Sequence, residues 1–168
     1  VGGDGATLPV SSTANAIPVK ALDNVITITA SLDTNAYADG DVLFETQEIA
    51  NAVNTAGDCC ILQSVTVSDI NDQGQGFDLI FFNANTSLGT ENSAPDIDDT
   101  EVLTVIGRVQ IGSGSFYDLG GNRVACVYGI GLLMKSGAST SLYVAGVSRG
   151  TGTYTASGLQ IQFGFLRN

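Results

Sequence analysis

The chain has 168 residues, a formal net charge of −11, and neither His nor Trp. Hydrophobic residues make up 43% and charged residues 14%, a composition typical of one folded domain with a core. The absence of His excludes Ser-His-Asp and Cys-His catalytic systems and His-ligated metal centres. The six basic residues are scattered singly, so we expect no nucleic-acid binding, which needs clustered positive charge.

Residues 1–20 are rich in Gly, Ser, Thr and Ala and contain two prolines. This composition predicts an extended N-terminal arm or linker, followed by one domain at 21–168. The sequence begins without Met, so we expect a processed N-terminus or a fragment of a longer chain. Gly, Ser, Thr and Asn interrupt the uncharged stretches, so no membrane span is predicted.

Alternation of apolar and polar residues predicts strands along this domain. At 61–69 it places Ile61, Val65 and Val67 on one face and Leu62 on the other. The predicted strands lie at 25–32, 41–46, 61–69, 77–84, 102–111, 116–118, 123–134, 141–148 and 159–165. Turn residues rich in Gly, Ser and Asp separate them.

Helical patterns are weak. Residues 45–53 predict one or two helical turns, and residues 93–103 predict a short capped helix with Pro95 in its first turn. We therefore expect an all-β fold: an antiparallel β-sandwich of jelly-roll type with one or two short helices and the extended arm. An immunoglobulin-like sandwich is the alternative.

Three cysteines are present, and an odd number does not suit a disulfide-stapled secreted domain. Cys59 and Cys60 are adjacent, so in a strand they point to opposite faces, and at least one is expected to be buried. We expect all three, including Cys126, to be structural thiols in a reducing compartment.

The segment "SDINDQGQGFDLIFF" (68–82) combines a polar loop with a strongly apolar strand. Its first part matches the start of an EF-hand loop, but Gln73 and Ile80 stand where Asp or Asn and a bidentate Glu are required. A turn with Asx-type backbone hydrogen bonds is the favoured interpretation. A calcium site of another geometry is the weaker one, with these candidate ligands: Asp69, Asn71, Asp72 and Asp78.

The strand that follows is apolar on both faces. Phe77, Leu79 and Phe81 share one face, while Ile80 and Phe82 lie on the other. A strand of this kind is covered on both sides. The second cover comes either from the same chain or from another subunit, and Ile80 and Phe82 are therefore interface candidates.

An acidic run at 96–101 raises the question of a carboxylate pair for glycoside hydrolysis. Acidic side chains in the first turn of a helix are the simpler explanation, because they favour its positive end. No acid–base pair, phosphate-binding loop or cofactor motif is present, so we expect a protein that is not an enzyme and binds no cofactor.

Two long segments resemble a β-rich domain in virion structural proteins of tailed phages. They are "LQSVTVSDINDQGQGFDLIFFNANTSLGTENSAPDIDD" (62–99) and "SLYVAGVSRGTGTYTASGLQIQFGFLRN" (141–168). The resemblance spans most of 22–168, and its most recognisable pieces are "ANTSLGTENSAP" and "SRGTGTYTASGL". It contains no catalytic motif.

The resemblance implies a virion protein, assembled in the host cytoplasm, that decorates or stabilises the capsid. Its partners would be the major capsid protein or other virion proteins, and such proteins are commonly homotrimers. The alternative is a head-fibre or tail-fibre module that binds a host surface glycan. The candidate stacking residues for a glycan are Tyr37, Tyr117, Tyr128, Tyr143 and Tyr154.

Overall fold

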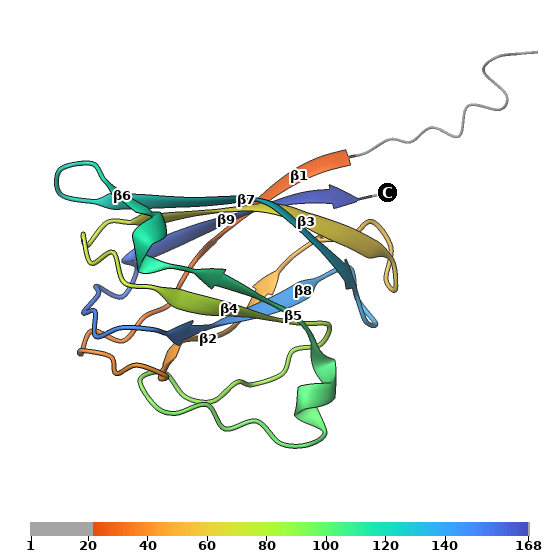
Figure 1. Ribbon diagram of the computed structural model, residues 1–168. Coiled ribbons are helices and arrows are strands. Elements are labelled where there is room, and N and C mark those ends of the chain that lie inside the picture. The colour runs from red at the N-terminus through yellow and green to blue at the C-terminus, as the bar shows by residue number, and fades with distance from the viewer. Residues whose placement is uncertain (1–21, 168) are drawn as a thin grey trace, which may run out of the picture.

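The computed structural model describes residues 22–167, and the predicted arm at 1–20 lies outside the described residues. The described chain forms two antiparallel sheets packed face to face (Figure 1). The strands are β1 (Leu22–Thr29), β2 (Val42–Ile49), β3 (Cys59–Asp69), β4 (Phe77–Phe82), β5 (Val105–Ile111), β6 (Phe116–Asp118), β7 (Arg123–Lys135), β8 (Leu142–Ser148) and β9 (Leu159–Arg167). Two short 3-10 helices are η1 (Glu101–Thr104) and η2 (Ser113–Ser115).

The strand order identifies the sandwich as a jelly roll. One sheet has the order β1-β9-β3-β7-β6 and the other has the order β2-β8-β4-β5. Successive strands change sheet except within the β4–β5 pair and the β6–β7 hairpin. An immunoglobulin-like sandwich keeps its first two strands in one sheet, whereas here β1 and β2 lie in different sheets. The predicted jelly roll is therefore confirmed.

Alternating side chains of both sheets fill the space between them. From β9, Ile161, Phe163 and Phe165 are buried, as the sequence pattern predicts. The rings of Phe163 and Phe81, which come from opposite sheets, form a T-shaped contact with centroids 5.8 Å apart. Burial of apolar side chains of this size contributes about 1.5–3 kcal/mol each, so this contact between sheets is a main source of stability.

A β-bulge corrects the predicted face pattern of β3. The register of β3 against both β7 and β9 shifts between Leu62 and Ser64. The extra residue brings Leu62 to the same buried side as Val65 and Val67, while Ile61 is only partly buried. A strict alternation does not allow for an inserted residue, so the prediction was wrong for Leu62 and Ile61.

The helix predictions were partly wrong. Residues 45–53 continue β2 to Ile49 and then turn, because these residues pair with β8. The short helix expected at 93–103 exists only as η1 at Glu101–Thr104, and Pro95 is not in it. Within the described residues, no helix has the length and apolar character to span a bilayer.

Candidate functional site

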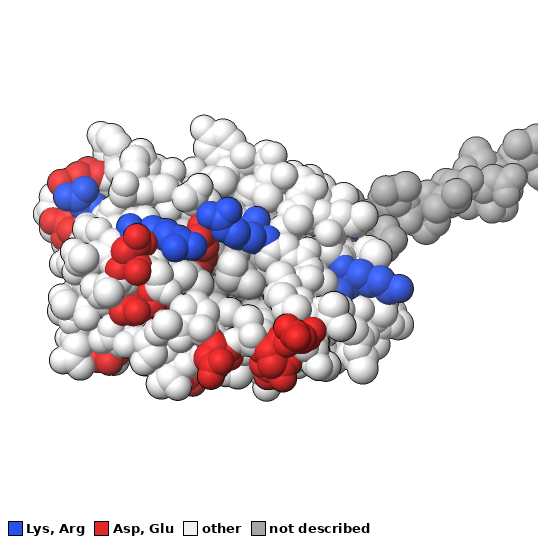
Figure 2. Space-filling model, turned by 60° about the horizontal axis from the view of Figure 1, so that its bottom comes forward, with Lys and Arg blue, Asp and Glu red and all other residues white. Residues whose placement is uncertain are grey.

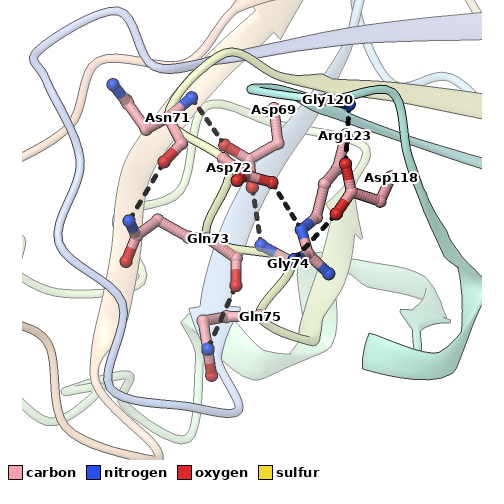
Figure 3. A network of polar contacts seen from close by, with 9 residues as sticks. All are labelled: Asp69, Asn71, Asp72, Gln73, Gly74, Gln75, Asp118, Gly120 and Arg123. Carbon is pink, nitrogen blue, oxygen red and sulfur yellow. Dashed lines mark hydrogen bonds and ion pairs between the residues drawn. The ribbon is translucent and has the colours of Figure 1, made fainter.

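The polar loop after β3 is organised by Asp69. Its side chain is completely buried, and its carboxylate accepts hydrogen bonds from the backbone N–H of Asn71 at 2.9 Å and of Gly74 at 2.7 Å (Figure 3). The first of these bonds is the expected Asx-type turn. Backbone N–H donors therefore satisfy a carboxylate that would otherwise be costly to bury.

The same loop is joined to the loop between β8 and β9. The side-chain oxygen of Asn71 accepts hydrogen bonds from the backbone N–H and the hydroxyl of Thr155, at 2.9 and 3.1 Å. The side-chain oxygen of Gln73 accepts one from the N–H of Thr153 at 3.1 Å. The loop is thus joined by hydrogen bonds to a second loop at the same end of the sandwich.

Arg123 at the start of β7 holds the outer side of the loop. Its Nε donates to Asp72 Oδ1 at 2.7 Å, and its guanidinium also lies 3.6 Å from Asp118 of β6 (Figure 3). The hydrogen bond to Asp72 raises the pKa of Arg123 above its ordinary value. Asp72 itself has a positive φ of 56°, which an Asp tolerates better than most residues.

Asp78 of β4 forms a second, separate charged group. Its side chain is completely buried and accepts hydrogen bonds from Arg108 of β5 and Arg149 after β8, both at 2.8 Å. Each carboxylate oxygen has its own guanidinium partner. The two arginines remain about half exposed, so their positive charges lie at the surface while the carboxylate of Asp78 is buried.

The four calcium candidates contact other protein groups in this structure, and a calcium site at them stays a prediction. Asp69, Asn71 and Asp72 share one loop, but their oxygens point to three different sets of N–H donors. Asp78 points to two arginines instead. Within residues 22–167, no group of three or more acidic or Cys side chains is arranged to hold a metal ion. The oxygens of these candidates hold the fold together.

The second face of β4 is covered by the chain itself. Phe82 is completely buried in a cluster with Val42, Leu88, Ala145 and Val147, and Ile80 packs against this cluster partly exposed. The β4–β5 segment, which runs along the bottom of Figure 1, supplies Leu88 and the partly buried Ile97. Phe82 therefore has no exposed surface to offer a partner, whereas Ile80 remains an interface candidate.

Backbone hydrogen bonds fix this covering segment in place. The N–H of Asn92 donates to the carbonyl of Val42 at 2.9 Å, and the N–H of Val42 donates to the carbonyl of Ser93 at 2.8 Å, so the segment is bonded to the start of β2. The N–H of Asp96 donates to the carbonyl of Leu88 at 3.0 Å, so the segment also closes on itself. Ile97 lies in the stretch 93–103 for which the sequence predicts a short helix, whereas Leu88 lies in a stretch without strand or helix periodicity and was not predicted to cover β4.

The acidic run at 96–101 caps η1. Asp98 Oδ1 accepts hydrogen bonds from the N–H of Thr100 and of Glu101, both at 2.7 Å, and Glu101 Oε2 accepts one from the N–H of Asp98 at 3.1 Å. This reciprocal arrangement resembles a capping box. The carboxylates of Asp98 and Glu101 are thus bonded to backbone N–H groups of their own segment.

Two surface hollows among residues 22–167 are small. One of about 260 Å³ is lined by Glu45, Thr46, Asn85 and Ser87. A second, of about 180 Å³, lies over the bulge of β3 and is lined mainly by residues of β1, β3 and β9. Small-molecule pockets begin at about 300 Å³, so neither has the size typical of a substrate site.

The Tyr residues suggested for glycan stacking and the three Cys residues differ in how deeply they are buried. Tyr37 and Tyr154 are buried with ring centroids 6.2 Å apart, and burial raises the pKa of Tyr37 to about 12. Tyr117 and Tyr128 are exposed, at 70% and 82%. Cys60 is buried and its neighbour Cys59 exposed, as predicted, and Cys126 is exposed and unpaired.

Comparison with known proteins gives only distant similarities. No protein-family model and no curated protein matches the chain. Among solved structures, the VP2 subviral particle of infectious bursal disease virus aligns at 13% identity and a TM-score of 0.37, covering 86% of this chain and 32% of that one. VP2 of this virus is therefore about three times as long as the part matched.

Two further structures give similar values. Desmodium yellow mottle tymovirus aligns at 16% identity and a TM-score of 0.30, covering 85% of this chain and 77% of that one. The Gx strain of infectious bursal disease virus aligns at 14% identity and a TM-score of 0.33, covering 86% and 31%. Similarity of this degree does not establish what the present chain does.

Proposed function

We propose that the chain is a virion structural protein that decorates or stabilises a capsid through protein–protein contacts. The supporting observation concerns the two sequence pieces on which the phage resemblance depends. "ANTSLGTENSAP" (84–95) lies in the segment that seals the second face of β4, and "SRGTGTYTASGL" (148–159) contains the loop joined to Asn71 and Gln73. Both pieces serve rigidity and leave no reactive group exposed.

The jelly roll is compatible with this proposal, since capsid proteins use it, but lectins and cupins use it as well. The use of the polar side chains supports the proposal further. The buried carboxylate of Asp69 is hydrogen-bonded by backbone N–H groups and that of Asp78 is paired with two arginines, as suits a rigid structural component. We expect the major capsid protein or other virion proteins as partners, assembly in the host cytoplasm and location in the virion. The homotrimer remains a prediction from the resemblance alone.

Purified particles of the encoding phage provide the test. The proposal expects many copies of the chain per particle by quantitative mass spectrometry, and density for a jelly roll on the head by electron microscopy. Particles in which the chain is absent from the head would contradict the capsid role.

A glycan-binding fibre module is the second candidate, and one observation favours it. The exposed rings Tyr117 and Tyr128 lie on the same outer face of the five-stranded sheet, beside uncharged Ser, Thr and Gln side chains. A glycan array with the wild-type chain and with Tyr128→Ala tests this. A signal that depends on Tyr128 supports glycan binding, and a flat array rejects it.

A further inference from the structure

The outer face of the five-stranded sheet is free of charge over most of its area. The strand register places outward-facing residues in rows across β1, β9, β3, β7 and β6. The rows are Thr29-Gln160-Ser68-Val124-Tyr117, Thr27-Gln162-Thr66-Cys126, Val25-Gly164-Ser64-Tyr128 and Asp23-Leu166-Ile61-Leu133, and Asp23 at the end of the last row is their one charged residue. We call the uncharged residues of these rows the neutral face.

The neutral face contrasts with the rest of a chain whose net charge is −11. Figure 2 shows another side of the molecule, where acidic side chains lie beside and below basic ones. The neutral face also carries four of the eight large exposed hydrophobic residues of the described chain. These are Val25, Tyr117, Tyr128 and Leu133. Apolar surface without charge is typical of the centre of a protein interface.

The neutral face is better suited to contact with another protein than the unpaired edge of β7. Beyond its pairing with β6, β7 has an open edge, but Gly129 and Gly131 have φ values of +72° and +66°. Two left-handed residues break the regular row of N–H and C=O groups that another strand would need. The residues of the neutral face on β7 lie on both sides of this irregular stretch, at Tyr128 and before it, and at Leu133 after it.

The extent of the face is enough for a modest interface. With strands about 4.8 Å apart and side chains on one face about 6.8 Å apart along each strand, it measures about 20 by 25 Å. Two such faces together bury about 1,000 Å², which is the lower limit for a specific protein–protein interface.

We propose that the neutral face is a self-association surface, on which the neutral face of a second copy packs. The charge distribution of the chain favours a second copy as the partner of the neutral face. Two copies repel each other wherever their acidic surfaces meet, and the neutral faces are where they approach without that repulsion. A basic partner would bind the acidic side instead. Because both copies use the same patch, the contact is two-fold and closes as a dimer. This inference does not depend on the virion role.

The test compares two substitutions of one kind. Gln162 is exposed in the middle of the neutral face, and Gln110 is exposed on β5 of the opposite sheet. We expect the full wild-type chain to form a dimer by light scattering between micromolar and millimolar concentration. Gln162→Lys, which places like charges opposite each other, should weaken the dimer roughly 100-fold, while Gln110→Lys should leave it unchanged. Thr27→Lys serves as a second variant on the same face if Gln162→Lys does not fold.

Cys126 gives an independent readout because it is exposed in the second row of the face. Its labelling by a bulky maleimide, measured by peptide mass spectrometry, should slow as protein concentration rises, and Gln162→Lys should abolish that slowing. A chain that stays monomeric at millimolar concentration, including one that binds glycans through Tyr128 as a monomer, overturns the proposal. So does an oligomer that Gln162→Lys leaves intact.

Discussion

The side chain of Asn71 accepts two hydrogen bonds from Thr155, one from its backbone N–H and one from its hydroxyl. These residues are 84 positions apart, and their contact joins the β3–β4 loop to the β8–β9 loop. Gly158 is buried beside them, and a methyl group at this position would collide with Asn71 Oδ1. One end of the sandwich is therefore closed by loop-to-loop hydrogen bonds.

Replacing Asn71 with Ala should lower the free energy of unfolding by roughly 1–2 kcal/mol, because two hydrogen bonds are lost. Gly158→Ala tests the same contact from the other side and should also destabilise. Asn85→Ala is the matched control, since Asn85 is exposed and should stay within about 0.5 kcal/mol of wild type. Urea unfolding measures all three. Equal stability of Asn71→Ala and Asn85→Ala would show that the loop contact contributes nothing.

Asp78→Asn should lower the free energy of unfolding by roughly 2 kcal/mol, the range for hydrogen bonds to charged groups. The amide would present N–H donors to two guanidinium groups that need acceptors. Asp39→Asn is the control, because Asp39 is 73% exposed and lies 3.9 Å from Arg149. It also removes one negative charge, but from an exposed ion pair that contributes little to stability. Thermal unfolding that ranks the two variants equally would contradict the importance of the buried group.

Phe82→Ala should cost about 3–5 kcal/mol, the usual loss for a buried Phe. It should also loosen the β4–β5 segment, whose Leu88 packs against the Phe82 ring's cluster. Cleavage at Glu91 by a glutamate-specific protease reports this opening directly. Ile80→Ala, at the partly exposed edge of the cluster, should show a smaller loss and slower cleavage. Unchanged cleavage in Phe82→Ala would mean that the segment is held by its hydrogen bonds alone.

Alkaline pH should destabilise the fold through Tyr37. Burial is the main cause that raises the pKa of Tyr37 from 10 to about 12, and burial also raises the pKa of Tyr154. The unfolded chain therefore loses these protons first, so stability is full below pH 10 and falls as pH rises toward 12. Each group contributes a slope of up to about 1.4 kcal/mol per pH unit. Tyr37→Phe should reduce the slope of urea-measured stability above pH 10, whereas the exposed Tyr128→Phe should not.

The sequence predicts the strands well because each sheet has one face against the core. Such a face requires an apolar residue at every second position, as Ile161, Phe163 and Phe165 show in β9. A β-sandwich follows from the strand number and the turns. The order of strands within the sheets does not, since it depends on pairing between distant segments.

Other features could not be predicted from local sequence patterns. The bulge that moves Leu62 to the core is one inserted residue with no composition of its own. Residues 45–49 have helical composition but lie in β2 because pairing with β8 outweighs their propensity. The polar residues of the 68–75 loop were identified as important. Their partners Thr153, Thr155 and Arg123 are distant in sequence, so only the fold shows what they bind.

The position of β9 has a consequence for folding during synthesis. This strand lies between β1 and β3, so the first strand of the described chain has its only described neighbour at the far end of the sequence. A chain still on the ribosome cannot complete this sheet until residues 159–167 have emerged. β1 therefore stays unpaired until β9 is available, although pairs such as β4–β5 and β6–β7 can form earlier, and joining β1 to the sheet is a long-range closure that is slow by nature.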